Sequence, residues 1–120
     1  MMDDRERTIG EKIANALGWT IKDDNFMGST WYEPEQDMKV DRTCRWNPLG
    51  DWGCLGYLVE YITWYYSDVI ITTSLTGEIW KCHITDSDAS YTKEAETLRE
   101  AICLAILEMF AVSKWETDGF

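Results

Sequence analysis

The last quarter of the chain contains a run of twelve residues, 101–112, in which Glu108 is the one charged side chain. Such a run predicts a helix that is apolar nearly all round, and a helix of this kind is buried on more than one side. In a chain of only 120 residues it must either be central or be covered by a second copy. From this helix we expect a homo-oligomer.

Two further helices are expected from periodicity and capping residues. The first lies within residues 8–18, where isoleucine and leucine recur every four residues, Thr8 has capping-box spacing to a glutamate, and Gly18 suits a helix end. The second follows the segment WNPLGDW and runs to about Tyr66, with Asn47 or Asp51 as its cap. The last helix has its own capping box at Thr97.

Between the second and third helices the period of the sequence changes to two. The segments DVIITTSL and EIWKCHIT are rich in β-branched residues and are separated by Thr76-Gly77, which predicts a hairpin with its turn there. In that register the apolar face pairs Thr73 with Trp80, Ile71 with Cys82, and Val69 with Ile84. The segments WTIK and STWYE, nearer the start, are expected to be short strands.

These elements indicate one α+β domain over residues 1–120. We expect a small antiparallel sheet, formed by the central hairpin with one or two short strands. Three helices would pack on it in an arrangement like an α-β-α sandwich.

Charge excludes some partners. The net charge of -11 would repel nucleic acids and anionic membranes, so we expect neither direct nucleic-acid binding nor membrane binding. Residues 38–66 are the exception, because three bases balance three acids there. This segment contains Lys39, Arg42 and Arg45, the only local enrichment of cations.

Targeting signals and metal motifs are not recognisable in the sequence. The start is charged rather than apolar, and no apolar run is long enough to span a membrane, so we expect a cytoplasmic protein. The four cysteines are scattered and no C-x₂-C pair occurs, which argues against a zinc site and for reduced thiols. We expect no metal and no cofactor.

Catalysis is not expected either. Cys82 and His83 are neighbours on a predicted strand, so their side chains point to opposite faces and cannot form a nucleophile–base pair. The paired carboxylates at 3–4, 23–24 and 86–88 lie in predicted loops or at the terminus, where solvation is their ordinary role. The sequence therefore favours a binding protein over an enzyme.

Three segments together resemble a known family. TIGEKIANALGW, WNPLGDW and EAICLAILEMF, in this order, resemble small phage and prophage proteins with the phage ABA sandwich domain. The resemblance implies helices covering both faces of a small sheet, and a phage accessory protein of the kind that includes proteins acting against host immunity. It brings no catalytic residues to carry over.

Two functions are expected from these features. The first is a phage-encoded counter-defence protein in the host cytoplasm that sequesters an immune signalling nucleotide, with bases stacked on aromatic rings and phosphates on arginines. The alternative is an acidic inhibitor, similar to anti-CRISPR proteins that mimic DNA, which binds a basic host defence protein. The expected ligand contacts are Trp31, Tyr32, Lys39, Arg42, Arg45, Trp46, Lys81 and His83.

Overall fold

In the computed structural model the last helix, α3 (Leu98–Asp118), is the centre of the fold. It packs on β5 and β6 on one side and on α1 on another, and Ala101, Cys103 and Ile106 are fully buried. The structure describes residues 3–24, 28–33, 39–43, 45–66, 68–87 and 89–118, apart from the side chains of residues 24, 42 and 112–118. The packing of α3 thus corresponds to the first of the two alternatives, a central helix.

The elements follow one another as three strands between the first two helices and three strands between the last two. The order is α1 (Asp4–Ala16), β1 (Thr20–Asp24), β2 (Gly28–Tyr32), β3 (Lys39–Arg42), α2 (Trp52–Tyr65), β4 (Ile70–Thr76), β5 (Ile79–Thr85), β6 (Ser90–Ala95) and α3. The α+β class is confirmed.

The helices begin at side chains that cap their first backbone N–H groups. Asp3 caps α1 by accepting from the N–H of Glu6, and Asp51 caps α2 by accepting from the N–H of Gly53 and of Cys54. The first helix thus begins four residues before the expected Thr8. The hydroxyl of Thr8 donates to a backbone carbonyl inside the helix, so it is not a cap.

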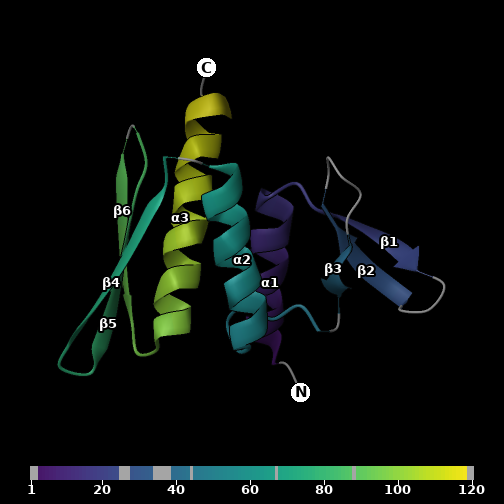
Figure 1. Ribbon diagram of the computed structural model, residues 1–120, viewed down its shortest axis with the longest axis horizontal. Helices are drawn as coiled ribbons and strands as arrows, with labels where there is room; N and C mark the ends of the chain where they lie inside the picture. The colour runs from purple at the N-terminus through teal and green to yellow at the C-terminus, as the bar shows by residue number, and fades with distance from the viewer. Residues whose placement is uncertain are drawn as a thin grey trace.

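Two antiparallel sheets form, each of three strands, with the orders β1-β2-β3 and β4-β5-β6. Figure 1 shows the helices as a middle layer with one sheet on either side. The layers thus differ from the sandwich-like expectation, in which one sheet lay between helices. The two short strands expected near the start do not join the hairpin, because they pair with β3 as a separate sheet.

The β4–β5 hairpin has a different register from the expected one. Thr73 pairs with Cys82, not with Trp80, because the turn is Gly77-Glu78 rather than Thr76-Gly77. Gly77 has φ +65°, a conformation that glycine adopts most easily. A shift of two residues keeps every side chain on its face, and Cys82 and Ile84 are buried as expected.

Six residues of α3 are buried within one copy of the chain. Buried residues from all three helices and both sheets form a single hydrophobic cluster, and α3 contributes residues 101–103, 105, 106 and 109 to it. This part of α3 therefore needs no second copy to cover it, and the homo-oligomer remains a prediction. No helix among the described residues has the length and hydropathy needed to cross a membrane.

Candidate binding pocket beside the second helix

An open pocket of about 530 Å³ lies along α2. Its walls are mainly aromatic and acidic, and the described residues that line it are Glu33, Tyr57, Glu60, Tyr61, Thr63, Trp64 and Tyr65. None of these lining residues is basic. Six of them come from α2, and Glu33 comes from the residue directly after β2.

The tyrosines of the pocket form one stripe along the helix. Tyr57, Tyr61 and Tyr65 are spaced by four residues, so they lie on the same face of α2 one turn apart. The rings of Tyr61 and Tyr65 stack with centroids 4.5 Å apart and planes inclined by 29°. Each of the two rings therefore covers one face of the other, and Tyr61 is buried in the core.

A buried tryptophan packs against two of these tyrosines. The ring of Trp19 meets Tyr57 and Tyr61 edge-on, with centroids 6.1 Å and 5.3 Å apart. Trp46 packs against the other side of Trp19 at 5.0 Å. Aromatic rings in edge-to-face contact are held in place by packing and by ring quadrupoles, so Tyr57 and Tyr61 are held in place before any ligand arrives.

The acidic end of the pocket is built around a buried carboxylate. Glu33 is only 6% exposed, and the hydroxyl of Tyr57 donates to its Oε1 atom at 2.5 Å. Burial raises the pKa of Tyr57 well above its ordinary value, and the hydrogen bond and charge of Glu33 raise it further. Tyr57 therefore stays a protonated donor, which orients the carboxylate.

Two residues on the outer face of α2 complete the pocket. Glu60 is exposed, and Trp64, one turn further along the helix, is 80% exposed. A large apolar ring left in solvent beside a pocket is typical of binding surfaces, where tryptophan is enriched among the residues that dominate affinity. Carboxylates and aromatic faces together attract cations.

Three of the expected ligand contacts are buried in the core. Trp31 and Trp46 are each 2% exposed, and Tyr32 is also buried. The indole Nε1 of Trp46 donates to the backbone carbonyl of Gly10 at 3.0 Å, which ties the α2 entry to α1. The faces of these rings are covered by the protein, so a base cannot stack on them in this structure.

The expected cations with described side chains are divided between the two sheets. Lys39 and Arg45 are exposed near the first sheet, and the side chain of Arg42 is outside the described residues. Lys81 and His83 lie on the second sheet, on the far side of the helical layer (Figure 1). Lys81 pairs there with Glu94 at 3.5 Å.

Cys82 and His83 point to opposite faces of their strand, as expected. Cys82 is fully buried, and Nδ1 of His83 lies 2.6 Å from the hydroxyl of Thr92 on the neighbouring strand. Burial raises the pKa of Cys82 to about 11, which makes the thiol a poor nucleophile. Within the described part of the chain, no group of three His, Cys, Asp or Glu side chains is placed to hold a metal ion.

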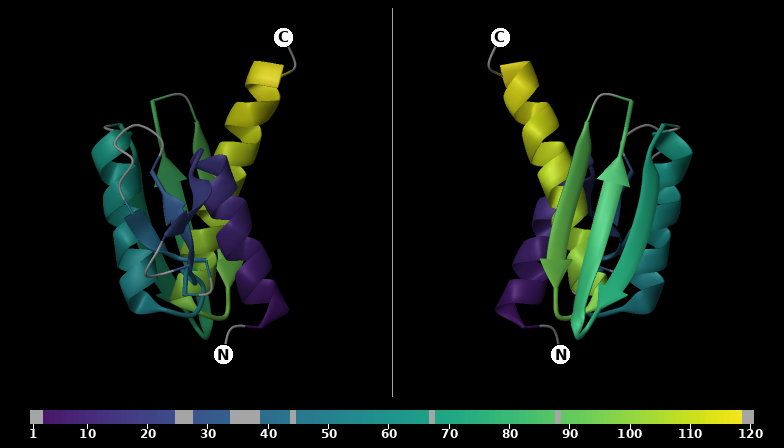
Figure 2. Two further views of the ribbon diagram at one scale, coloured as in Figure 1. Left: turned by 90° about the vertical axis from the view of Figure 1, so that its right-hand side faces the viewer. Right: turned by 90° about the vertical axis from the view of Figure 1, so that its left-hand side faces the viewer.

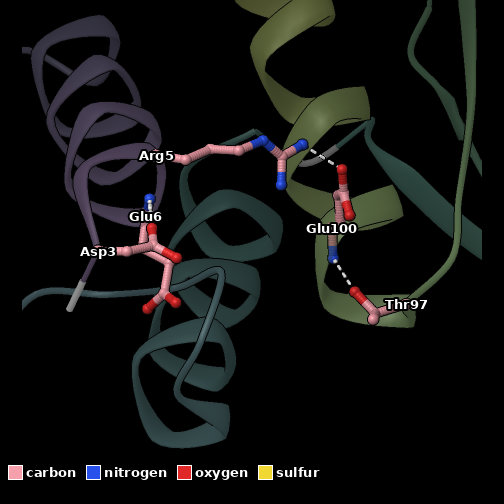
Figure 3. A network of polar contacts seen from close by, with 5 residues as sticks. All are labelled: Asp3, Arg5, Glu6, Thr97 and Glu100. Carbon is pink, nitrogen blue, oxygen red and sulfur yellow. Dashed lines mark hydrogen bonds and ion pairs between the residues drawn. The ribbon is translucent and has the colours of Figure 1, made fainter. Parts of the chain in front are cut away.

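A second polar cluster joins the beginnings of the three helices. Its described members are Asp3, Arg5, Glu6, Leu49, Gly50, Thr97, Arg99 and Glu100. Figure 3 shows Arg5 of α1 paired with Glu100, whose backbone N–H is capped by Thr97. Arg99 donates to the carbonyl of Leu49 at 3.0 Å. Three acids and two bases lie here, and the contacts are those of a helix-end junction.

The comparison with solved structures found a protein of similar fold. No family model and no curated protein matches the chain, so the family resemblance remains a prediction. A crystal structure of a phage protein from Bacillus cereus ATCC 14579 is similar, with a TM-score of 0.53 and 23% sequence identity. The match covers 89% of this chain and 91% of that one, so the similarity extends over the whole fold.

The pocket was not among the features expected from the sequence. One signal for it was present, since tyrosines at positions 57, 61 and 65 fall on one helix face. The role of Glu33 had no local signal, because it depends on a contact with Tyr57, 24 residues away.

Proposed function

We propose that this protein is a phage-encoded, non-catalytic binding protein that occupies a basic surface of a host protein. The observation that carries the proposal is the pocket beside α2, whose described lining is acidic and aromatic in a chain of net charge -11. Such a surface is complementary to the basic channels with which proteins bind nucleic acids. The phage setting is supported by the fold shared with a phage protein.

Sequestration of a nucleotide, the first expectation from the sequence, finds less support in this geometry. A nucleotide needs a stacking face beside cations. Trp31 and Trp46 are buried, and Lys81 and His83 lie across the helical layer from Lys39. The pocket beside α2 offers aromatic faces, but Glu33 and Glu60 would repel phosphates.

The proposal is tested by capture and competition. The immobilised protein is exposed to host extract at low and high salt, and each captured protein is purified and assayed for nucleic-acid binding with and without the chain. We expect a basic nucleic-acid-binding protein that high salt releases and whose nucleic-acid binding the chain competes away. A captured protein whose nucleic-acid binding is unaffected contradicts the proposal.

Native mass spectrometry of the protein purified from its host separates the two functions. A chain that carries no small molecule agrees with the proposal. An intact nucleotide that stays bound in the native state and is released on denaturation would instead support sequestration. The same spectrum gives the number of subunits.

A further inference from the structure

The pocket beside α2 combines two features that discriminate between cations. One is the aromatic lining at Tyr65, which is half-buried, and at Trp64, whose ring is 80% exposed. The other is a pair of carboxylates, Glu33 from the end of β2 and Glu60 from α2, which line the same pocket. A ligand that fills the pocket therefore meets an aromatic face and carboxylate oxygens together.

From this geometry we infer that the pocket receives the guanidinium group of an arginine side chain from the partner protein. This inference rests on the proposed function and names the chemistry of its site. A guanidinium is planar and weakly hydrated, so it stacks on aromatic rings at small desolvation cost. Its five N–H donors form a fork that can bind carboxylate oxygens in two directions.

A lysine side chain fits the same site less well. Its ammonium is a compact, strongly hydrated charge that does not stack in parallel with a tyrosine ring. Desolvation in an aromatic pocket costs an ammonium more than a guanidinium, and its three donors form no planar fork. The aromatic lining at Tyr65 and Trp64 therefore favours arginine over lysine.

Trp64 extends the aromatic surface toward the partner. Its ring is 80% exposed and lies one helical turn from Glu60, so it can cover the apolar stem of an arginine whose head reaches the carboxylates. Exposed tryptophan beside a pocket is also a residue type that dominates interface energies. The pocket volume of about 530 Å³ leaves room for the side chain together with ordered water.

The test compares two peptides of equal length and charge, one rich in arginine and one rich in lysine, titrated by calorimetry. We expect the arginine peptide to bind about threefold to thirtyfold more tightly, the range of an aromatic–guanidinium contact. The variants Glu60→Gln and Trp64→Ala should each weaken the binding of the arginine peptide by a similar factor. They should also narrow the difference in affinity between the two peptides. Both residues are exposed, so circular dichroism should show an unchanged fold.

Two matched controls make the result specific. Glu78→Gln removes one exposed carboxylate at the β4–β5 turn, and Trp52→Ala removes an exposed tryptophan at the other end of α2. We expect neither to alter the preference for arginine. Equal binding of the two peptides overturns the inference. So does a Glu78→Gln variant that weakens binding as much as Glu60→Gln, because binding would then follow net charge alone.

The inference and the proposed function can fail separately. A captured host protein whose affinity is the same for the parent chain, Glu60→Gln and Trp64→Ala would leave the proposed function standing and overturn the arginine site. Specific binding of the arginine peptide, with no basic host protein captured, would support the arginine site and contradict the proposed function.

Discussion

At the scale of single residues, close contacts decide what a position tolerates. Gly10 of α1 faces the second-helix entry, where a Cβ atom would lie 3.2 Å from the carbonyl oxygen of Trp46 and 3.4 Å from Cδ of Pro48. Gly56 of α2 faces open space, with no atom within 4 Å of a Cβ. A larger side chain would thus be crowded at position 10, whereas position 56 has room for it.

Alanine at these two positions should change stability in opposite directions. Gly56→Ala should raise the free energy of unfolding by about 0.5–1 kcal/mol, because alanine loses less backbone entropy in a helix. Gly10→Ala should lower it by about 1–3 kcal/mol, since overpacking against Trp46 outweighs the same helical gain. Urea denaturation of both variants measures this, and a stabilised Gly10→Ala would show that the contact yields without cost.

The buried thiols predict how stability depends on alkaline pH. Burial raises the pKa of Cys82 to about 11 and that of Cys103 to about 12, from an ordinary value of 9.0. The folded state therefore holds these protons more tightly than the unfolded state. Their contribution to stability is complete below about pH 9 and is lost as the pH rises toward the folded-state values.

We therefore expect the urea midpoint to fall as the pH is raised from about 9 to about 11. Cys103→Ala, which removes one of the two thiols, should make this fall less steep, whatever its effect at neutral pH. Tyr57, whose pKa is also raised, contributes in the same direction in both proteins. An equal slope in the variant and the parent would contradict the role of the thiol.

At the scale of elements, the observed cap of α1 differs from the cap that the sequence pattern predicted. Asp3 accepts from the N–H of Glu6 at 2.7 Å, whereas Thr8 lies inside the helix. Asp3→Ala should cost about 0.5–2 kcal/mol of unfolding free energy, the usual value of an N-cap. Thr8→Ala should be within about 0.5 kcal/mol of the parent, or slightly stabilising, because alanine favours helix interiors.

Thermal denaturation of the two cap variants gives the comparison directly. A larger loss for Thr8→Ala than for Asp3→Ala would mean that the helix begins at the capping box expected from the sequence. Glu11→Ala serves as a control, since Glu11 would be the partner of Thr8 in that box and alanine cannot take that role.

Strands were harder to predict than helices for identifiable reasons. The three helices have clear apolar stripes or runs. In β6 only Tyr91 is buried, and Lys93 on the same face forms an ion pair with Glu108 of α3 at 2.6 Å. The sequence of β6 therefore lacks the alternation of apolar and polar residues that predicts a strand. The β4–β5 register depended on one turn residue, which a pattern of period two cannot fix.

The scale of the whole molecule explains why the site could be predicted only in part. The acidity and the seven tryptophans and six tyrosines were visible in the sequence, and acidic and aromatic residues both line the observed pocket. Which tryptophans are buried depends on contacts between distant segments, such as Trp46 with Gly10, 36 residues apart. The sequence shows that aromatic residues are abundant, whereas the fold decides which of them face solvent.

The arrangement of layers also explains why the expected cations do not converge. Lys39 and Lys81 are separated by the helical layer, because the two sheets lie on opposite sides of it (Figure 1). Figure 2 shows the second sheet from its outer face, with the helices behind it. The expected binding site combined residues of both sheets. Such a site would require these strands to lie in a single sheet, as in the expected sandwich-like arrangement.

The charge of the whole molecule leads to a last prediction. With a net charge of -11, the folded chain has more mutual repulsion than the expanded unfolded chain, so repulsion lowers stability. Salt screens such interactions over about 8 Å at physiological ionic strength. We expect the melting temperature to rise as sodium chloride is added at neutral pH.

Glu78→Lys changes the net charge from -11 to -9 at an exposed turn, so this variant should melt higher than the parent at low salt and gain less from added salt. Equal gains in both proteins would mean that the salt acts through general exclusion from the protein surface rather than through screening.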